Sequence, residues 1–308
     1  MRILITGGCG QIGTVLSKAL QDKHGFDNVI VTDIRSSPPF ECVYEQLDVT
    51  DSNKLFYLIS KYHVSQLYHL AAILSAKGEA NPIFTWNINM NGLLNILESA
   101  KNYQLDRVFY PSTIAVFGLL TPRIDTPQHT NLTPETVYGI SKAAGENWCN
   151  YYFKKYGVDV RSLRYPGIIS WDTQPGGGTT DYAVDIFHKA VETGKYESYI
   201  DQGTRLPMMY MPDAIKATLE LMDAPKETIK VRTSYNVAAM SFTPAELAVA
   251  IQQHLPDFQI TYQPDFRQAI AASWPESIDD REARKDWNWQ ESFDLAAMTS
   301  DIIKNLTA

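Results

Sequence analysis

The chain has 308 residues, of which 44% are hydrophobic and 20% charged, a composition typical of a globular protein with a sizeable core. Its formal net charge of −8, without a basic stripe, argues against nucleic acid as a partner. Its three cysteines lack metal-ligand spacing and no run of 18 apolar residues occurs, so we expect reduced thiols in the cytoplasm, no metal and no membrane span.

Short apolar runs alternate with helical patterns through the first 170 residues. Strand character is found at 2–6, 29–32, 43–47, 66–70, 107–110 and 160–164, and helical periodicity at 11–20, 53–62, 87–102 and 138–156. Thr50 or Asp51 is expected to cap the second of these helices. Strands joined by helical crossovers lie parallel, so the pattern predicts an α/β fold with a doubly wound Rossmann sheet.

The pattern loosens beyond residue 170. A helix at 213–222 and a strand at 234–237 are expected to return to the sheet. We therefore predict an NAD-binding Rossmann domain formed by 1–170 with 212–240. Residues 171–211 and 241–308 would form a smaller C-terminal substrate-binding lobe over the carboxyl ends of the strands, where open α/β sheets bind ligands.

Three glycines, Gly7, Gly10 and Gly13, lie between the first strand and the first helix. This spacing permits a tight turn, close approach of a pyrophosphate and tight helix–sheet packing, and the helix N-terminus offers N–H groups to phosphate. Asp33 ends the second strand, where a carboxylate can accept from ribose hydroxyls and repel a 2′-phosphate. The pattern predicts NAD, although Arg35 leaves NADP as an alternative.

Tyr138 and Lys142 form a Y-x-x-x-K pair one helical turn apart. A tyrosine needs a nearby cation to act as a base near neutral pH, because its ordinary pKa is about 10. Lys142 can supply that charge and hold the nicotinamide ribose. We therefore expect Tyr138 to be the general acid/base and Lys142 to assist it.

These motifs resemble those of the extended short-chain dehydrogenase/reductase family. Residues 111–118, PSTIAVFG, are similar to the family's S-S/T-x-x-x-Y/F-G element, and matching on Gly118 places a third catalytic residue at Thr113. The glycine motif and the resemblance together imply a set of cofactor contacts. These are Gly7, Gly10, Gln11, Ile12, Gly13, Asp33, Ile34, Arg35, Asp48, Val49, Leu70, Ala71, Ala72, Asn87, Tyr138, Lys142, Tyr165 and Ile168.

Two further segments resemble the short-chain-type threonine dehydrogenases of this family. Residues 178–183 read GTTDYA and residues 273–280 read SWPESIDD, while Pro166 replaces the Asn that contacts a nucleotide diphosphate in sugar-nucleotide enzymes. The resemblance implies oxidation of the C3 hydroxyl of L-threonine by NAD⁺ to 2-amino-3-ketobutyrate. Its implied substrate contacts are Ser75, Ser112, Thr113, Tyr138, Thr179, Thr180 and Trp274.

Two other functions use the same cofactor motifs. An NAD-dependent nucleotide-sugar epimerase or dehydratase would share the catalytic residues. A non-catalytic NAD(H)-sensing regulator need not keep them, so the intact Thr113, Tyr138 and Lys142 speak against it.

A homodimer is also expected. Extended family members pair through the helix after the fourth strand and the helix that bears the catalytic tyrosine. In this chain the latter helix has a large apolar load, contributed by Trp148, Tyr151, Tyr152 and Phe153.

Overall fold

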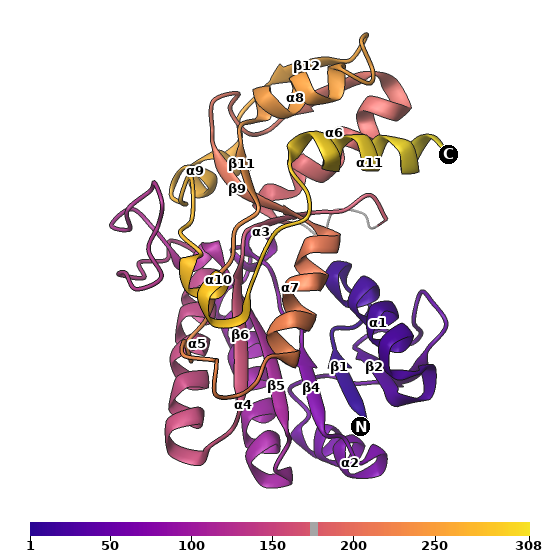
Figure 1. The fold of residues 1–308 in the computed structure, drawn as a ribbon, viewed down its shortest axis with the longest axis vertical. Coiled ribbons are helices and arrows are strands. Elements are labelled where there is room, and N and C mark those ends of the chain that lie inside the picture. Colours follow the sequence, from indigo (N-terminus) through magenta and orange to yellow (C-terminus); the bar gives the residue numbers. More distant parts are fainter. Residues whose placement is uncertain (173–177) are drawn as a thin grey trace.

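The computed structural model describes residues 1–172 and 178–308, and its centre is a seven-stranded parallel sheet (Figure 1). The strand order is β10-β6-β5-β4-β1-β2-β3. The bounds are β1 (Ile3–Thr6), β2 (Val29–Asp33), β3 (Val43–Gln46), β4 (Gln66–His69), β5 (Arg107–Thr113), β6 (Val160–Tyr165) and β10 (Tyr235–Asn236). The predicted doubly wound parallel sheet is confirmed.

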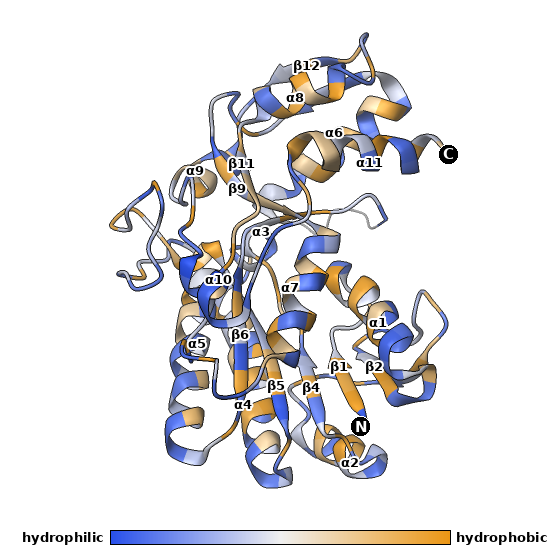
Figure 2. Cartoon of the chain, in the orientation of Figure 1, coloured by the Kyte–Doolittle hydropathy of each residue, from blue (hydrophilic) through white to orange (hydrophobic). Residues whose placement is uncertain are grey.

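Helices cover both faces of the sheet. The first face packs against α1 (Gln11–His24) and α7 (Met211–Asp223), and the second against α2 (Ser52–Tyr62), α4 (Pro82–Tyr103) and α5 (Val137–Tyr156). Successive strand residues face opposite sides, so Ile3 and Ile5 join the first core cluster and Leu4 the second. Both faces are apolar because both are covered, and β1 and β2 are accordingly mostly hydrophobic, with polar residues at their carboxyl ends (Figure 2).

Side-chain caps set the beginnings of several helices. Asp51, one of the two predicted caps, accepts a 3.0 Å hydrogen bond from the backbone N–H of Lys54, whereas the Thr50 hydroxyl donates to Asp48. Asn81 caps α4, which begins five residues before the expected position. Of the helices within 1–172 and 178–308, none combines the length and apolarity that a membrane crossing requires.

A smaller lobe lies beyond the carboxyl ends of the strands, at the top of Figure 1. It has its own core cluster, which draws on α6, β9, α8 and α11. Two small sheets, β11-β9-β7 and β12-β8, belong to this region. The bounds are β7 (Gly167–Ile169), α6 (Tyr182–Thr193), β8 (Lys195–Ser198), β9 (Leu206–Tyr210), β11 (Met240–Phe242), α8 (Pro244–Gln252), β12 (Gln259–Tyr262), α9 (Phe266–Ala272) and α11 (Leu295–Thr307).

One segment from the predicted lobe range packs on the large sheet instead. Helix α10 (Arg281–Trp287) and Trp289 join the core cluster beneath that sheet, and the Tyr235 hydroxyl on β10 donates to Asp286 at 2.7 Å. The division into a Rossmann domain and a lobe stays a prediction, and these contacts place α10 on the Rossmann side of it.

Candidate active site

The glycine loop connects β1 to α1 and is packed so tightly that side chains are excluded. Gly7 has a φ of 68°, and a Cβ atom there would lie 2.5 Å from the backbone nitrogen of Ala71. A Cβ on Gly13 would lie 2.5 Å from the carbonyl oxygen of Gly7. The loop therefore presents bare backbone and the N-terminus of α1, which is the surface that a pyrophosphate requires.

On one side of this loop lies a hollow that we call the Asp33 hollow. It lies at the ends of β2, β3 and β4, and the side chain of Gln46 on β3 donates to the Ile34 carbonyl oxygen at 2.9 Å. Its lining includes Gly7, Gly10, Asp33, Ile34, Asp48, Val49, Leu70, Ala71 and Ala72, all of them predicted cofactor contacts. The apolar walls and the Asp33 carboxylate at the end of β2 suit an adenine and its ribose.

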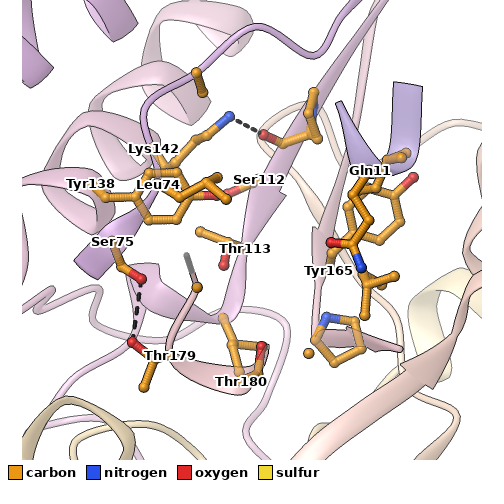
Figure 3. Close-up of a pocket in the computed structure, with 18 of the residues that line it drawn as sticks. Gln11, Leu74, Ser75, Ser112, Thr113, Tyr138, Lys142, Tyr165, Thr179 and Thr180 are labelled. Carbon is orange, nitrogen blue, oxygen red and sulfur yellow. Dashed lines mark hydrogen bonds between the residues drawn. The ribbon is translucent and has the colours of Figure 1, made fainter. Parts of the chain in front are cut away.

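On the other side lies a second hollow, the Tyr138 hollow, which shares Gly7, Gly10, Leu70 and Ala72 with the first. The two therefore meet at the glycine loop. Figure 3 shows Tyr138, Lys142, Ser112 and Thr113 on one side of the Tyr138 hollow and Gln11 with Tyr165 on the other. The predicted residues that line it are Gly7, Gly10, Gln11, Ile12, Gly13, Leu70, Ala72, Ser75, Ser112, Thr113, Tyr138, Lys142, Tyr165, Ile168, Thr179, Thr180 and Trp274.

The amide of Gln11 is a further indication that the hollows bind a ligand. Its amide nitrogen is buried and has no hydrogen-bond partner among the residues that the structure describes. Buried amides are normally paired, so this donor is available to a polar group in the hollow. Two joined hollows with a bare-backbone cradle between them fit a dinucleotide, with the nicotinamide end beside Tyr138.

The predicted catalytic residues come together from β5 and α5. Thr113 ends β5 and Tyr138 lies in the first turn of α5, and both side chains line the Tyr138 hollow. Lys142 follows one turn later, and its ammonium donates to the Pro111 carbonyl oxygen at 2.6 Å. A hydroxyl, a phenol and an ammonium therefore face one cavity from two rigid elements.

Burial dominates the electrostatics of this group. It raises the pKa of Tyr138 to about 12, although the nearby Thr113 hydroxyl partly opposes the change. It lowers the pKa of Lys142 to about 7, against the attraction of Cys149 and Glu146. The Lys142 ammonium is 5.8 Å from the centre of the Tyr138 ring. The lysine was predicted to lower the pKa of the phenol, but the effect of burial is larger and the net change is upward.

A buried ion pair beneath the site was missed by sequence reasoning. Glu146 accepts two hydrogen bonds from Arg164, at 2.9 and 2.7 Å, and a third from the Ser112 hydroxyl at 2.6 Å. Each of these side chains is less than 5% exposed. Glu146 lies four residues after Lys142, so the helical period that relates Tyr138 to Lys142 was the available signal.

The predicted substrate contacts lie around the same cavity. The hydroxyls of Ser75, in α3 (Ser75–Gly78), and Thr179 are 3.3 Å apart (Figure 3), and both residues are buried. Thr180 and the buried Trp274 also line the cavity, and Trp274 belongs to the core cluster of the lobe. These contacts therefore come from both parts of the chain, as expected for a site closed by the lobe.

Three predicted cofactor contacts lie differently from the expectation. Asn87 is exposed and lines neither hollow, whereas Asn89 is buried and bonds to the backbone of Ile73 and to Ser141. Asn89 lies on the apolar face of α4, so the helical period could have identified it. Arg35 is exposed and outside both linings, and the Tyr165 hydroxyl bonds to Thr218 on α7, leaving only its ring at the cavity.

His69 has a structural place at the end of β4. Its Nδ1 is 2.8 Å from the Thr6 hydroxyl oxygen, and burial lowers its pKa to about 3, so the ring is neutral. In residues 1–172 and 178–308, no group of three or more His, Cys, Asp or Glu side chains is arranged to hold a metal ion.

Comparison with known proteins gives consistent matches over the whole chain. Residues 3–238 match the model of the NAD dependent epimerase/dehydratase family. An uncharacterized epimerase/dehydratase of Staphylococcus aureus (strain USA300) is 49% identical over 308 residues, covering 98% of this chain and 96% of that protein.

Two solved structures show the same similarity. A GalE-like L-threonine dehydrogenase from Cupriavidus necator, in its holo form, is 52% identical with a TM-score of 0.98, covering 99% of this chain and 100% of that one. A monomeric L-threonine 3-dehydrogenase from a metagenome, in its apo form, is 50% identical with a TM-score of 0.96, covering 99% of this chain and 98% of that one.

These matches confirm the resemblance predicted from the motifs, and they confirm NAD as the cofactor. The family model extends from β1 past β10, and so includes the glycine loop, Asp33 and the Thr113, Tyr138 and Lys142 group. The chain therefore belongs to the NAD dependent epimerase/dehydratase family, within the extended short-chain dehydrogenases/reductases.

Proposed function

We propose that the protein oxidises the C3 hydroxyl of L-threonine to 2-amino-3-ketobutyrate with NAD⁺. The observation that carries this proposal is a small cavity, rich in hydroxyl groups, at the nicotinamide end of the dinucleotide site. Its polar lining comes from Ser75, Ser112, Thr113, Thr179 and Thr180. The similarity to L-threonine dehydrogenases over 99% of the chain supports the same reading.

Each of the three catalytic groups has a separate task. Bound NAD⁺ supplies a hydride acceptor and a positive charge beside the phenol. Tyr138 takes the proton of the C3 hydroxyl, and the Thr113 hydroxyl, which lines the same hollow, donates to the same substrate oxygen and keeps it aligned with the phenol. Lys142 lies one turn along the helix, where an ammonium lowers the cost of the phenolate and binds ribose hydroxyls.

The site also excludes water from the reacting atoms. Ser75, Thr179 and Trp274 are each less than 5% exposed, and they cover the cavity from the lobe and from the loop after β4. In such an environment the hydrogen bonds to a small zwitterion are stronger than in water. A sugar nucleotide would need room for a diphosphate, and Pro166 at this wall supplies no amide for one.

Absorbance at the NADH wavelength tests the proposal directly. Purified protein with NAD⁺ should form NADH on addition of L-threonine, and a matched Tyr138→Phe protein gives the background rate. UDP-glucose and UDP-galactose, assayed for epimerisation and dehydration in parallel, should remain unchanged. Turnover of a UDP-sugar without oxidation of threonine would overturn the proposal in favour of an epimerase or dehydratase.

We further infer a homodimer formed by the outer faces of α4 and α5. These helices pack side by side, and large apolar side chains stay exposed on them, namely Ile83, Trp86, Ile140, Trp148 and Tyr151. Exposed apolar surface of this extent on neighbouring helices favours association. One relative at 50% identity is monomeric, so the oligomeric state depends on the surface residues of the individual protein.

We also infer a cytoplasmic location for the protein. All three cysteines are free thiols, and burial raises the pKa of Cys9 to about 11 and also raises that of Cys149. Buried, protonated thiols of this kind are typical of a reducing compartment.

A further inference from the structure

The ammonium of Lys142 is held in a place that offers it little water. The residue is 4% exposed, and one of its three N–H donors is used by the Pro111 carbonyl oxygen at 2.6 Å. Burial lowers its pKa to about 7, so near neutral pH the charged and neutral forms are closely balanced. Whatever else touches the ammonium therefore decides how much of it is charged.

The ammonium also lies over the face of an aromatic ring. The ammonium nitrogen is 4.4 Å from the centre of the Tyr110 ring, against 5.8 Å for the Tyr138 ring. A cation within about 6 Å of a ring centre is attracted by the ring's negative face, and the attraction is stronger where water is excluded. Tyr110 is 3% exposed, so water is excluded from this contact and the attraction is strengthened.

The ring is fixed on every side. It stacks on His69 with ring centres 6.3 Å apart and an angle of 17°, and His69 is itself bound to the Thr6 hydroxyl. A Cβ atom on Gly145 would lie 2.2 Å from the Tyr110 hydroxyl, so Gly145 leaves the space that the phenol fills. The ring cannot turn away from Lys142 without moving β4 or α5.

Other charged or titratable groups also face the ammonium, but they cannot replace the ring. On α5, Glu146 and Cys149 favour the charged form, yet Glu146 is already bound by Arg164 and burial keeps Cys149 a thiol. On β4, His69 is neutral because burial lowers its pKa to about 3. The fourth group, Tyr138, is the proposed base, and its ring centre is 5.8 Å from the ammonium nitrogen, farther than that of Tyr110.

We propose that Tyr110 is a positioning residue for Lys142, whose ring face holds the ammonium charged and directed toward the ribose end of the Tyr138 hollow. The negative face of the ring stabilises the ammonium charge, as water would do if the side chain were not buried. The inference rests on the proposed role of Lys142, and it assigns a task to the aromatic ring and none to its hydroxyl.

Two substitutions separate the ring from the hydroxyl. Tyr110→Phe keeps the face of the ring, and Tyr110→Leu removes it. Competitive acetylation by acetic anhydride across a pH series, read at Lys142 by mass spectrometry in the cofactor-free protein, gives the titration midpoint of this amine. We expect the midpoint of Tyr110→Phe to match the parent and that of Tyr110→Leu to lie about one pH unit lower.

A matched control accounts for lost packing. Phe109 is the preceding residue of β5, fully buried on the opposite face of the sheet, so Phe109→Leu also shrinks a core aromatic without touching Lys142. It should lower the melting temperature and leave the Lys142 midpoint in place. The same midpoint in Tyr110→Leu and parent, or an equal shift in Tyr110→Phe, would overturn the proposal.

NAD⁺ titration provides a second readout that needs no substrate. Affinity for NAD⁺ at pH 8 should fall about tenfold in Tyr110→Leu, because the charged fraction of Lys142 falls by about that factor. It should change little in Tyr110→Phe. Failure of the threonine proposal would appear separately, as a parent protein that binds NAD⁺ and does not oxidise threonine. An NAD⁺ affinity that is equal in all three proteins would count against Tyr110.

Discussion

The Asp33 carboxylate accepts a 3.1 Å hydrogen bond from the backbone N–H of Cys9, which lies inside the glycine loop. Its other oxygen accepts from the backbone N–H of Arg35 at 3.2 Å. These bonds hold one negative charge at the wall of the Asp33 hollow, where an adenine ribose would lie. Ribose hydroxyls can donate to this carboxylate, whereas a 2′-phosphate is repelled by it.

Asp33→Ala should therefore reverse much of the cofactor preference. A charge-assisted hydrogen bond contributes about 1.5–3 kcal/mol, so NAD⁺ affinity should fall about 10- to 100-fold while NADP⁺ affinity rises. Arg35→Ala is the matched control and should leave the preference unchanged, because the Arg35 side chain lies outside the hollow. Fluorescence titration of both cofactors measures the ratio; a preference that depends on Arg35 would assign the choice to that residue instead.

Thr113 tests whether the site uses a hydroxyl or a methyl group at the end of β5. Thr113→Ser keeps the hydroxyl in the Tyr138 hollow, and Thr113→Val keeps the shape without it. We expect the serine protein to stay active and the valine protein to lose about 10-fold or more in kcat/KM, the value of one hydrogen bond to a reacting group. Comparable activity in the two proteins would show that Thr113 only fills space.

Much of this site could be predicted because its signals are local in the sequence. Gly7, Gly10 and Gly13 lie in one short segment at the start of the first helix, and Tyr138 and Lys142 are one helical turn apart. The alternation of strands and helices then places these segments at one edge of the sheet. All of the expected cofactor and substrate contacts except Arg35 and Asn87 accordingly line one of the two hollows.

The remaining features depend on contacts between distant parts of the chain. Glu146 meets Arg164 only because α5 packs across β6, and no local period reveals that partner. Trp289 packs in the core cluster on the α1 and α7 face of the large sheet, although in sequence it lies between the lobe helices α9 and α11. Local patterns also could not foresee that burial raises the pKa of Tyr138, since the water around it is removed by the loops that close the cavity.

His69 predicts an acid-sensitive component of stability. Its pKa in the folded protein is about 3, below the ordinary value of about 6.5, so the unfolded chain binds a proton that the folded chain does not. The stabilisation is full above pH 6.5 and is lost as the pH falls from 6.5 toward 3, by up to about 1.4 kcal/mol per pH unit.

His69→Gln removes this titration. The difference in the free energy of unfolding between parent and variant should shrink by about 1 kcal/mol between pH 6.5 and 5.5, measured by urea denaturation. A difference that is constant over this range would mean that the folded protein accepts the proton.

Sedimentation equilibrium tests the proposed dimer. At micromolar concentration the parent should have twice the 34.7 kDa mass of a single chain. Trp148→Glu places a charge in the apolar face of α5 and should give the monomer mass. Val249→Glu, at an exposed apolar position on α8, should leave the dimer intact; a parent of monomer mass contradicts the interface.

The rate of threonine oxidation by Tyr138→Phe is the most direct test of the central claim. The substitution removes one oxygen and keeps the ring in the wall of the Tyr138 hollow, near Lys142 (Figure 3). Turnover of L-threonine should fall roughly 10²–10⁴-fold, the usual contribution of a positioned acid/base, while NAD⁺ affinity changes little because Asp33 and the glycine loop are intact. A Tyr138→Phe protein that oxidises threonine at near the parent rate would contradict the mechanism, even with NAD⁺ binding unchanged.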